Sequence, residues 1–472
     1  MSIDGPREEC GVFAIAAPTR DVARLTYFAL HAMQHRGQES AGMAVGDGGV
    51  TVVRELGLVA SVFDEPSLMS LTGERAIGHV RYSTTGANKW DNAQPVTSQR
   101  MGGMVALGHN GNLTNSDELR ADLAEGEMLL EAGTDSELIA AAIGEAAGNL
   151  AQAAEQTMKR IVGAYSVVAL DEQSIIAFRD PSGVRPLSLG RLGGDGWCVA
   201  SETCAFEQIG ARFEREVRPG EIVVLRPDGV ESIQAVPSKG AKLCVFEQIY
   251  FARPDSVLDG GTVWQRRRRM GEQLAVESPA PADLVVGLPD SGTPAAIGFA
   301  RAGGIAYSEA VVRNRYVGRS FIQPDQSLRR QGVRLKFSPL EDVIAGKRLV
   351  VVDDSIVRGT TTGQVVEMLK DAGATEIHLR ISSPPVLWPC FYGIDMADRE
   401  QLIAANHDVD DIATMTGATS LAYLSLDGLQ SAIGTPASGY CRACLTGDYP
   451  IALPESADKL RFEADACGSV GA

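Results

Sequence analysis

Residues 349–363 read Leu-Val-Val-Val-Asp-Asp-Ser-Ile-Val-Arg-Gly-Thr-Thr-Thr-Gly, which is an apolar run followed by two aspartates and a loop rich in hydroxyl groups. The apolar run predicts a buried strand, and the sequence after the loop predicts a helix that ends near Gly373. A strand, a loop and a helix in this order indicate a parallel sheet, whose ligands bind at the carboxyl ends of the strands. The loop is therefore the first candidate binding site.

This loop presents paired carboxylates and then a series of hydrogen-bond donors. Asp353 and Asp354 come at the end of the predicted strand, where adjacent carboxylates can accept hydrogen bonds from two ribose hydroxyl groups. Residues 355–362 offer N–H and hydroxyl groups at a helix N-terminus, which suits a phosphate. A Walker-type loop is excluded because its Gly-Lys-Ser/Thr ending is absent. A helix cap or a general divalent-metal site is the alternative interpretation of the two aspartates.

The loop resembles the signature loop of type I phosphoribosyltransferases, and a second loop extends this resemblance. Residues 287–294 read Gly-Leu-Pro-Asp-Ser-Gly-Thr-Pro and are similar to the pyrophosphate loop of phosphoribosylpyrophosphate amidotransferases. The resemblance implies one Mg²⁺ per subunit on Ser291, Asp353 and Asp354, which carry the oxygen ligands that magnesium prefers. It implies that phosphoribosyl pyrophosphate is bound by Asp353, Asp354, Ser355, Arg358, Gly359, Thr360 and Thr361.

Between the two loops, the basic segment 313–324 resembles the flexible lid that covers the substrate in that family. Its positive side chains suit an anionic substrate. Arg313 stands where a Lys is expected. Because a planar guanidinium and a compact ammonium bind phosphate differently, Arg313 is not counted among the predicted binding residues.

The chain has 472 residues, and its organisation changes between residues 230 and 240. Before this point lie short apolar strands such as 11–16 and 165–170, with one clear helix that Asp21 caps and Gly37 ends. After it, predicted strands alternate with predicted helices. A chain of this length usually forms more than one domain. We expect a mostly antiparallel α+β domain followed by an α/β domain with a parallel sheet.

Charge and hydropathy exclude two kinds of partner. Lys and Arg total 43 against 60 Asp and Glu, and the net charge of −17 opposes binding to nucleic acid. The N-terminus lacks a basic region followed by an apolar run, and no stretch approaches the roughly 20 apolar residues of a membrane span. We therefore expect a cytoplasmic enzyme that binds neither nucleic acid nor a membrane.

Cys10 opens the first of five motifs in the N-terminal half. Taken alone, a cysteine with small apolar neighbours is usually a buried packing residue. Here it begins a segment similar to the start of class II glutamine amidotransferases, whose nucleophile is the N-terminal cysteine of the mature chain. Four further segments match in the order of that family. The five segments are 10–15, 34–42, 78–84, 108–112 and 133–137.

The resemblance implies a four-layer αββα fold of the N-terminal nucleophile (Ntn) type for this half. It also implies that residues 1–9 are a propeptide, removed by self-cleavage after Glu9. The free α-amino group of Cys10, with an unperturbed pKa of about 8, then serves as general base while the thiol attacks the glutamine amide.

The same resemblance assigns roles to four residues near the nucleophile. The side chain of Asn110 and the backbone N–H of Gly111 would form the oxyanion hole. Arg81 would bind the carboxylate of glutamine, and Asp135 its ammonium group. Each side chain has an ordinary alternative: Arg81 as a surface ion pair, Asn110 as a turn residue and Asp135 as a helix cap.

Four other cysteines suggest a metal site. Cys441 and Cys444 form a C-x-x-C pair, while Cys244 and Cys390 lie elsewhere in the chain. The residues alone suggest a closed four-thiolate site, for which structural zinc is the first interpretation. Their sequence contexts resemble the iron–sulfur branch of the amidotransferases, which implies one 4Fe-4S cluster per subunit. Such a cluster would act as a structural staple.

The two halves together resemble the amidophosphoribosyltransferase family over nearly the whole chain. The resemblance implies four parts, which are a propeptide at 1–9, a glutaminase domain at 10–235, a phosphoribosyltransferase domain at 236–450 and a tail at 451–472. The expected reaction transfers ammonia from glutamine to phosphoribosyl pyrophosphate, giving 5-phosphoribosylamine, glutamate and pyrophosphate, and opens purine biosynthesis. Feedback inhibition by purine nucleotides and a homotetramer are further implications.

Two other classes of function explain less of the sequence. A sugar-phosphate aminotransferase or an asparagine synthetase would share the N-terminal motifs but would leave Asp353 and Asp354 unexplained. A non-catalytic regulator that binds phosphoribosyl pyrophosphate, and nucleic acid through Arg266–Arg269, would need no glutaminase. We expect this arginine run on a helix, as a solvated face or a subunit contact.

Overall fold

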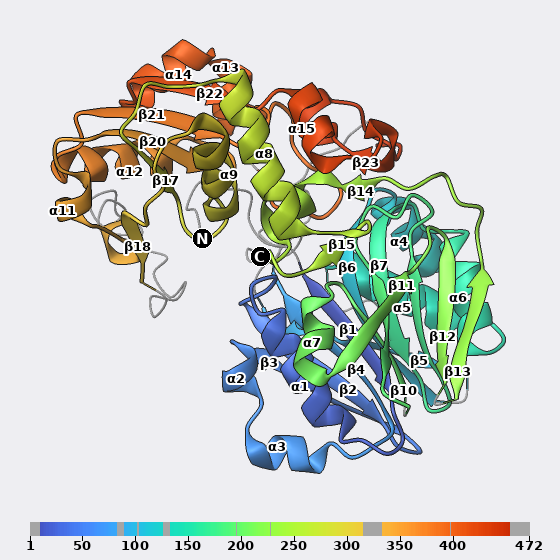
Figure 1. Ribbon diagram of the computed structural model, residues 1–472. Coiled ribbons are helices and arrows are strands. Elements are labelled where there is room, and N and C mark those ends of the chain that lie inside the picture. The colour runs from blue at the N-terminus through green and yellow to red at the C-terminus, as the bar shows by residue number, and fades with distance from the viewer. Residues whose placement is uncertain are drawn as a thin grey trace, which may run out of the picture.

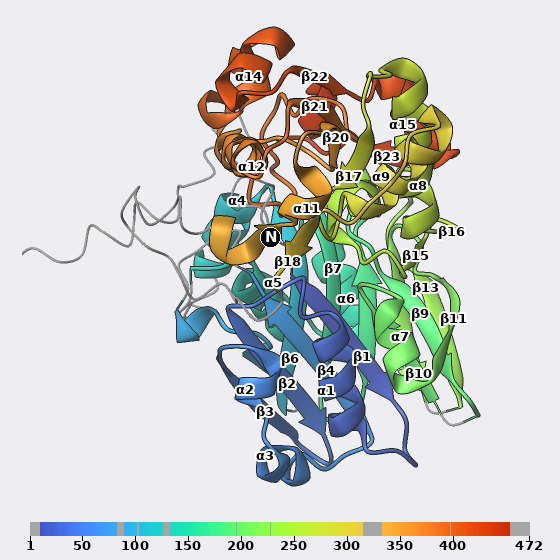
Figure 2. The same cartoon turned by 60° about the vertical axis from the view of Figure 1, so that its left-hand side comes forward.

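The computed structural model describes residues 10–82, 89–101, 103–125, 133–194, 196–226, 228–314, 333–396 and 398–453. The predicted propeptide, the greater part of the predicted lid and most of the predicted tail lie outside these ranges. Figures 1 and 2 both show the sheets of the N-terminal half at one end of the molecule and a parallel sheet at the other. Within the described ranges, no helix has the length and apolar character needed to cross a membrane.

Two antiparallel sheets make up the N-terminal half. The seven strands of the first sheet are, in spatial order, β11 (Ala211–Glu216), β9 (Ser188–Leu192), β10 (Gly196–Ala200), β1 (Gly11–Ala16), β4 (Arg75–Arg81), β2 (Ser40–Gly46) and β3 (Val50–Leu56). The six strands of the second sheet are β13 (Gly229–Gln234), β12 (Glu221–Arg226), β8 (Ile175–Arg179), β7 (Gly163–Leu170), β6 (Gly103–Leu113) and β5 (Val96–Arg100). The strands predicted at 11–16 and 165–170 are therefore confirmed.

Alternating side chains on these strands build three apolar layers. Val12 and Ala14 of β1 meet Val168 and Leu170 of β7 between the two sheets. Helices cover both outer faces. On the first sheet they are α1 (Val22–Ala32), α2 (Val59–Val62), α3 (Glu65–Ser70) and α7 (Cys204–Ile209), and on the second α4 (Ser116–Glu125), α5 (Asp135–Glu145) and α6 (Leu150–Met158). The predicted four-layer αββα fold is confirmed.

The first helix begins where the sequence predicts but ends earlier. The carboxylate of Asp21 caps α1 by accepting a backbone N–H of its first turn at 3.0 Å. The helix ends at Ala32, so the predicted end at Gly37 is wrong. After Ala32 the chain makes tight turns that carry the Arg36 guanidinium into the interior, where this residue is 2 % exposed. The ion pairs that hold this guanidinium involve residues far away in sequence.

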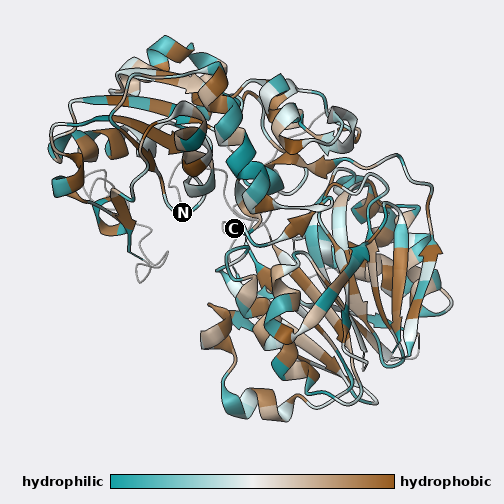
Figure 3. Cartoon of the chain, in the orientation of Figure 1, coloured by the Kyte–Doolittle hydropathy of each residue, from teal (hydrophilic) through white to brown (hydrophobic). Residues whose placement is uncertain are grey.

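The second half contains the predicted parallel sheet. Its strands are β17 (Leu284–Gly287), β20 (Arg348–Asp353), β21 (Glu376–Ile381) and β22 (Ser420–Tyr423). Apolar residues run along these strands, as Figure 3 shows. The helices that pack on the sheet are α8 (Val263–Glu277) and α9 (Thr293–Gly303) on one face, and α12 (Thr360–Asp371) and α14 (Val409–Thr416) on the other. The end of α12 confirms the helix predicted to stop near Gly373.

The arginine run lies on α8, as predicted, but half of it is not solvated. Arg266 and Arg267 are buried. The guanidinium of Arg267 donates to the carbonyl oxygens of Gln248 at 2.9 Å and Ala252 at 2.8 Å. The prediction of a solvated face is therefore wrong for these two arginines, because their planar donors satisfy backbone acceptors inside the fold.

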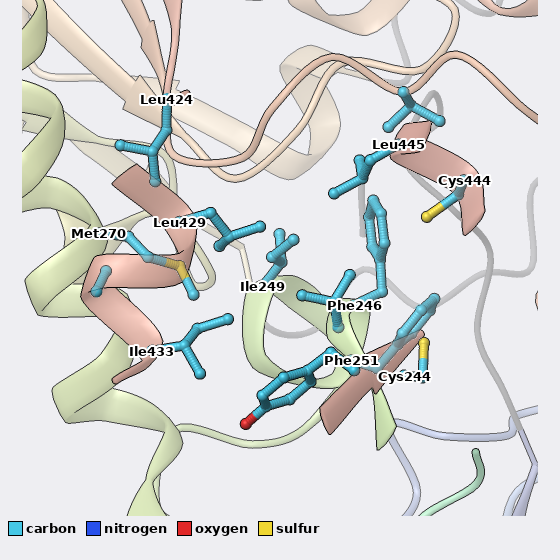
Figure 4. Close-up of a cluster of buried hydrophobic side chains, with 14 of the residues drawn as sticks. Cys244, Phe246, Ile249, Phe251, Met270, Leu424, Leu429, Ile433, Cys444 and Leu445 are labelled. Atoms are coloured by element: carbon cyan, nitrogen blue, oxygen red, sulfur yellow. The ribbon is translucent and has the colours of Figure 1, made fainter. Parts of the chain in front are cut away.

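A short parallel pair joins distant parts of the second half. β14 (Leu243–Cys244) pairs with β23 (Tyr440–Cys441), and Cys244 lies opposite Cys441. The helices α15 (Leu426–Ile433) and α16 (Ala443–Thr446) flank β23 in the sequence. Residues from all of these elements share one apolar cluster with α8, part of which Figure 4 shows.

Candidate functional site

Cys10 immediately precedes β1 and is buried. Its thiol donates to the carbonyl oxygen of Tyr82 at 3.4 Å. Burial raises the pKa of the Cys10 thiol to about 11, while the charge of Arg81 acts in the opposite direction. A thiol with such a pKa is a weak nucleophile at neutral pH and needs a nearby base to activate it.

Arg81 and Asp135 lie close enough to Cys10 for their charges to act on its thiol. Arg81 ends β4 and is 3 % exposed, with its guanidinium 3.7 Å from the carboxylate of Glu39. The alternative of a surface ion pair is therefore wrong. Asp135 is the first residue of α5, but the cap of that helix is Thr134. Asp135 instead accepts the backbone N–H at the end of β6 at 3.1 Å, so the helix-cap alternative is wrong as well.

Asn110 and Gly111 follow one another on β6, opposite β7. The side-chain amide nitrogen of Asn110 is buried and has no hydrogen-bond partner in the described part of the chain. A buried donor of this kind is costly unless a ligand accepts its hydrogen bond. Gly111 has φ of +145°, and a Cβ at this position would lie 2.0 Å from the carbonyl oxygen of Ala164. Only glycine fits this position in β6.

Gln94, His109 and Ser136 form a hydrogen-bonded group that was not predicted from the sequence. The side chain of Gln94 accepts the backbone N–H of His109 at 2.7 Å and donates to the hydroxyl of Ser136 at 3.0 Å. The same hydroxyl lies 3.1 Å from Nδ1 of His109. These contacts fix the backbone next to Asn110 and Asp135. His109 and Ser136 lie within the motifs, whereas Gln94 lies outside all of them and gave no signal.

A cavity of about 540 Å³ lies where the two halves meet. Asp353 and Asp354, at the end of β20, line it together with Ser291, which follows β17. His35 and Arg36 of the N-terminal half line the same cavity. Residues from the two sets of predicted motifs are therefore brought together in one space.

The two aspartates are held by hydrogen bonds within the loops. Asp354 accepts the hydroxyls of Ser291 and Ser355, each at 2.5 Å, and its backbone N–H donates to Asp353 at 2.9 Å. Burial raises the pKa of both carboxyl groups, and the neighbouring charge of Asp354 raises that of Asp353 further. Two carboxyl groups in this situation favour a ligand that brings a cation or hydroxyl donors.

Part of the loop before α12 has the geometry of a phosphate-binding helix N-terminus. Gly359 has φ of +82°, and a Cβ there would lie 2.6 Å from Cδ1 of Ile403. Thr361, in the first turn of α12, is buried and lines the cavity. Arg358 instead donates to the side chain of Gln401 at 3.1 Å. The predicted loop thus reaches the cavity through Asp353, Asp354 and Thr361.

The four predicted cluster cysteines are buried in one apolar cluster. Burial raises the pKa of Cys441 to about 12, and the charge of Cys390 acts in the same direction. Burial also raises the pKa of Cys444, and the charges of Cys390 and Cys441 raise it further. In Figure 4 the sulfur atoms of Cys244 and Cys444 are turned toward one another. No three or more His, Cys, Asp or Glu side chains in the described ranges are arranged to hold a single metal ion.

Known proteins match both halves of this chain. A family model described as a glutamine amidotransferase domain matches residues 79–208. The amidophosphoribosyltransferase of Synechococcus elongatus is 51% identical over 466 residues, which cover 97% of this chain and 94% of the relative. The chain belongs to the amidophosphoribosyltransferase family. The relative with the same name from Bacillus subtilis is 45% identical, and the alignment covers 96% of each chain.

Solved structures of this family have the same fold. The glutamine phosphoribosylpyrophosphate amidotransferase of B. subtilis, complexed with ADP and GMP, is 44% identical with a TM-score of 0.89. The match covers 95% of this chain and 98% of that one. A structure described as the allosteric regulatory enzyme of purine biosynthesis is also 44% identical, with a TM-score of 0.90. Membership of the amidophosphoribosyltransferase family accounts for both sites, which the rival amidotransferases and a non-catalytic regulator do not.

Proposed function

We propose that this chain transfers ammonia from glutamine to phosphoribosyl pyrophosphate, giving 5-phosphoribosylamine, glutamate and pyrophosphate, as the first committed step of purine biosynthesis. The main support for this proposal is the cavity that the two halves share. Its wall on the N-terminal side includes Arg36, whose guanidinium donates to the carbonyl oxygen of Cys10 at 3.1 Å. The side chain of Arg36 therefore lies between Cys10 and the cavity that Asp353 and Asp354 line.

Hydrolysis of glutamine begins once residues 1–9 have been removed. The free α-amino group of Cys10 takes the thiol proton, and the thiolate attacks the side-chain carbonyl carbon of glutamine. Arg81 binds the carboxylate of the substrate, and Asp135 binds its ammonium group. The buried charges of these two residues near the thiol support this assignment.

Asn110 and Gly111 stabilise the oxygen anion that forms. The unpartnered amide of Asn110 supports its role as a donor, and each such donor is worth roughly 2.7–4 kcal/mol in the transition state. The carbon–nitrogen bond then breaks, and ammonia leaves with the proton from the α-amino group of Cys10. Water hydrolyses the remaining thioester to glutamate.

Ammonia reaches the second site in its neutral form. Its lone pair attacks the anomeric carbon of phosphoribosyl pyrophosphate while the bond to pyrophosphate breaks, and the nitrogen then passes a proton to the released pyrophosphate. Asp353 and Asp354 hold the ribose hydroxyls, and the loop from Ser355 through Arg358, Gly359, Thr360 and Thr361 holds the 5-phosphate. A passage closed to water would keep the ammonia from being protonated on its way.

Ser291, Asp353 and Asp354 fit one Mg²⁺ per subunit. These side chains offer oxygen ligands, and burial raises the pKa of both carboxyl groups, which a cation would relieve. The ion would supply positive charge for the pyrophosphate leaving group. The carboxyl groups themselves orient the ribose by accepting hydrogen bonds from its hydroxyl groups.

Cys244, Cys390, Cys441 and Cys444 fit a 4Fe-4S cluster, which would place this chain in the iron–sulfur branch. All four cysteines are buried in one apolar cluster, and they lie close enough for the charge of one thiolate to act on the others, which supports this proposal. A cluster separates its thiolates by irons and sulfides, so a site for a single ion is not required. Visible absorbance with iron and sulfide analysis tests this, and a colourless, zinc-loaded, active enzyme would remove the cluster.

The remaining proposals concern organisation. We propose domains at 10–235 and 236–450 with a tail at 451–472, a cytoplasmic homotetramer, and inhibition by purine nucleotides. The ADP and GMP in the structure of the B. subtilis relative support nucleotide regulation. Sedimentation and inhibition by each nucleotide are the direct measurements.

A Cys10→Ala variant tests whether glutamine hydrolysis and ammonia transfer take place at two separate sites. We expect this variant to keep residues 1–9 by mass spectrometry and to release no glutamate from glutamine. It should still release pyrophosphate from phosphoribosyl pyrophosphate when ammonium salts are supplied. Normal glutamine hydrolysis by a protein that retains Met1 would overturn the proposal.

A further inference from the structure

His79 is a fully buried side chain that the proposed reaction does not use. It lies on β4 two residues before Arg81, so the two side chains project from the same face of that strand. A Cβ built on Gly108 of β6 would lie 3.7 Å from both Cβ and Cδ2 of His79. The imidazole therefore occupies the space between the two sheets, beside the strand that carries Asn110.

The backbone of β6 loses its strand partner just before Asn110. β5 pairs with β6 only as far as Leu107. Beyond that point, the backbone N–H of His109 donates to the side-chain oxygen of Gln94 at 2.7 Å. The carbonyl oxygen of the same residue accepts a hydrogen bond from Nε2 of His79 at 3.0 Å. Because an unpaired backbone group inside a fold is costly, these two side chains satisfy groups that a neighbouring strand would otherwise satisfy.

The carbonyl of His109 belongs to the peptide group whose nitrogen is that of Asn110. Since a peptide group is planar, the hydrogen bond from His79 fixes the orientation of the backbone from which the side chain of Asn110 extends. The amide nitrogen of Asn110 is buried and unpartnered among the described residues, and an oxyanion donor is effective only when it is held in place beforehand. His79 thus connects the strand of Arg81 to the backbone of the proposed oxyanion donor.

The imidazole of His79 supplies one neutral N–H donor. Burial lowers the pKa of His79 to about 3, and the charge of Arg81 acts in the same direction. A carbonyl oxygen only accepts hydrogen bonds, so Nε2 carries the hydrogen and Nδ1 does not. Within the described ranges, Nδ1 has no hydrogen-bond partner. A group with this pKa is a poor general base at neutral pH, which leaves its hydrogen bond to the backbone as its contribution.

We propose that the Nε2–H group of His79 positions the peptide group between His109 and Asn110, so that the amide of Asn110 meets the oxygen anion formed on glutamine. His79 is a positioning residue that does not touch the substrate. This inference rests on the proposed function, because it requires glutamine hydrolysis at Cys10 with Asn110 as a donor.

Two substitutions separate the hydrogen bond of His79 from its buried volume. His79→Gln keeps an N–H donor near the position of Nε2, whereas His79→Leu fills the space without a donor. We expect His79→Leu to lower kcat for glutamate release by about 10–100-fold, because a misplaced oxyanion donor stabilises the transition state less. The KM for glutamine should change by less than about threefold, since the donor acts only on the transition state. His79→Gln should keep kcat within about threefold of the wild type.

A His378→Leu variant is the matched control. His378 is also buried, but it lies on β21 of the second half, with its ring nitrogens 2.9 Å from the hydroxyl of Ser420 and 3.1 Å from the carboxylate of Glu376. This variant should lose stability while its kcat for glutamate release stays unchanged. Pyrophosphate release with ammonium salts should be equal in the wild type and both His79 variants, because that reaction does not use Asn110.

Three results would overturn the inference. They are a wild-type kcat in His79→Leu, a loss in that variant that appears in KM alone, or an equal loss of kcat in His79→Gln. Should His79→Leu lose its cooperative thermal transition, His79→Asn replaces it with the same expected result, because the amide of asparagine ends near the position of Nδ1. A wild-type protein that releases no glutamate would refute the proposed function and this inference together, whereas the three results above leave the proposed function intact.

Discussion

A Gly393→Ala substitution should damage glutamine hydrolysis from the other half of the chain. Gly393 has φ of +101°, and a Cβ there would lie 2.9 Å from the carbonyl carbon and 3.0 Å from the Cα of Gly111. The segment is held in place because the side chain of Asn112 donates to the carbonyl oxygen of Phe391 at 3.0 Å. The new methyl group would therefore push the backbone that carries the proposed oxyanion donor.

The magnitude follows from two contributions. A non-glycine residue at positive φ costs about 1–2 kcal/mol, and overpacking against rigid backbone adds about 1–3 kcal/mol to the loss of folding free energy. Displacement of one oxyanion donor lowers the rate of glutamine hydrolysis by up to about 10²–10³-fold. Synthesis from ammonium salts should change little, because it does not use that donor.

A Gly240→Ala variant is the matched control for this experiment. Gly240 has a similar φ of +88°, but no atom lies within 4 Å of a Cβ built there. It should lose only the backbone term of about 1–2 kcal/mol in urea unfolding and keep its glutaminase rate. The reasoning fails if Gly393→Ala releases glutamate at the wild-type rate, or if both reactions fall by the same factor.

Three further predictions concern single residues. Asn110→Ala should lower glutamate release about 10²–10³-fold while pyrophosphate release with ammonium salts is unchanged. Asp354→Asn should lower the ammonia-dependent reaction by about 10–100-fold, since a hydrogen bond to a charged group is worth about 1.5–3 kcal/mol, and should leave basal glutamate release intact. Burial lowers the pKa of His79 to about 3 from 6.5, so its contribution to stability is present above pH 6.5 and is lost as the pH falls. Lowering the pH from 7 to 5 should therefore reduce the free energy of unfolding by about 2 kcal/mol. Urea unfolding of His79→Asn, which should lack this part of the slope, is the check.

Local patterns predicted the loops and the order of the elements well. The apolar run before Asp353 and the cap at Asp21 depend on neighbours in sequence, and both features are confirmed. The early end of α1 could not be predicted, because it depends on the burial of Arg36 against Glu247, which is 211 residues away. Gln94 was missed for the same reason.

Predictions from the sequence were least accurate for the arginines. A run of four positive charges on a helix suggests a solvated face, yet Arg266 and Arg267 point inward. Their acceptors are backbone carbonyls, a tyrosine hydroxyl and the carboxylate of Asp259, and no local sequence pattern marks these partners. Buried guanidinium groups are therefore visible only once the packing partners are placed.

The pairing of β14 with β23 has a consequence for synthesis on the ribosome. Leu243 emerges early in the second half, but its partner Tyr440 emerges near the end of translation. Contacts so distant in sequence form slowly, and until then the apolar cluster around Cys244 remains open to water and to other chains. A nascent chain stalled before Tyr440 should therefore be a strong client for chaperones, while its N-terminal half, whose sheets are complete by Gln234, is already folded.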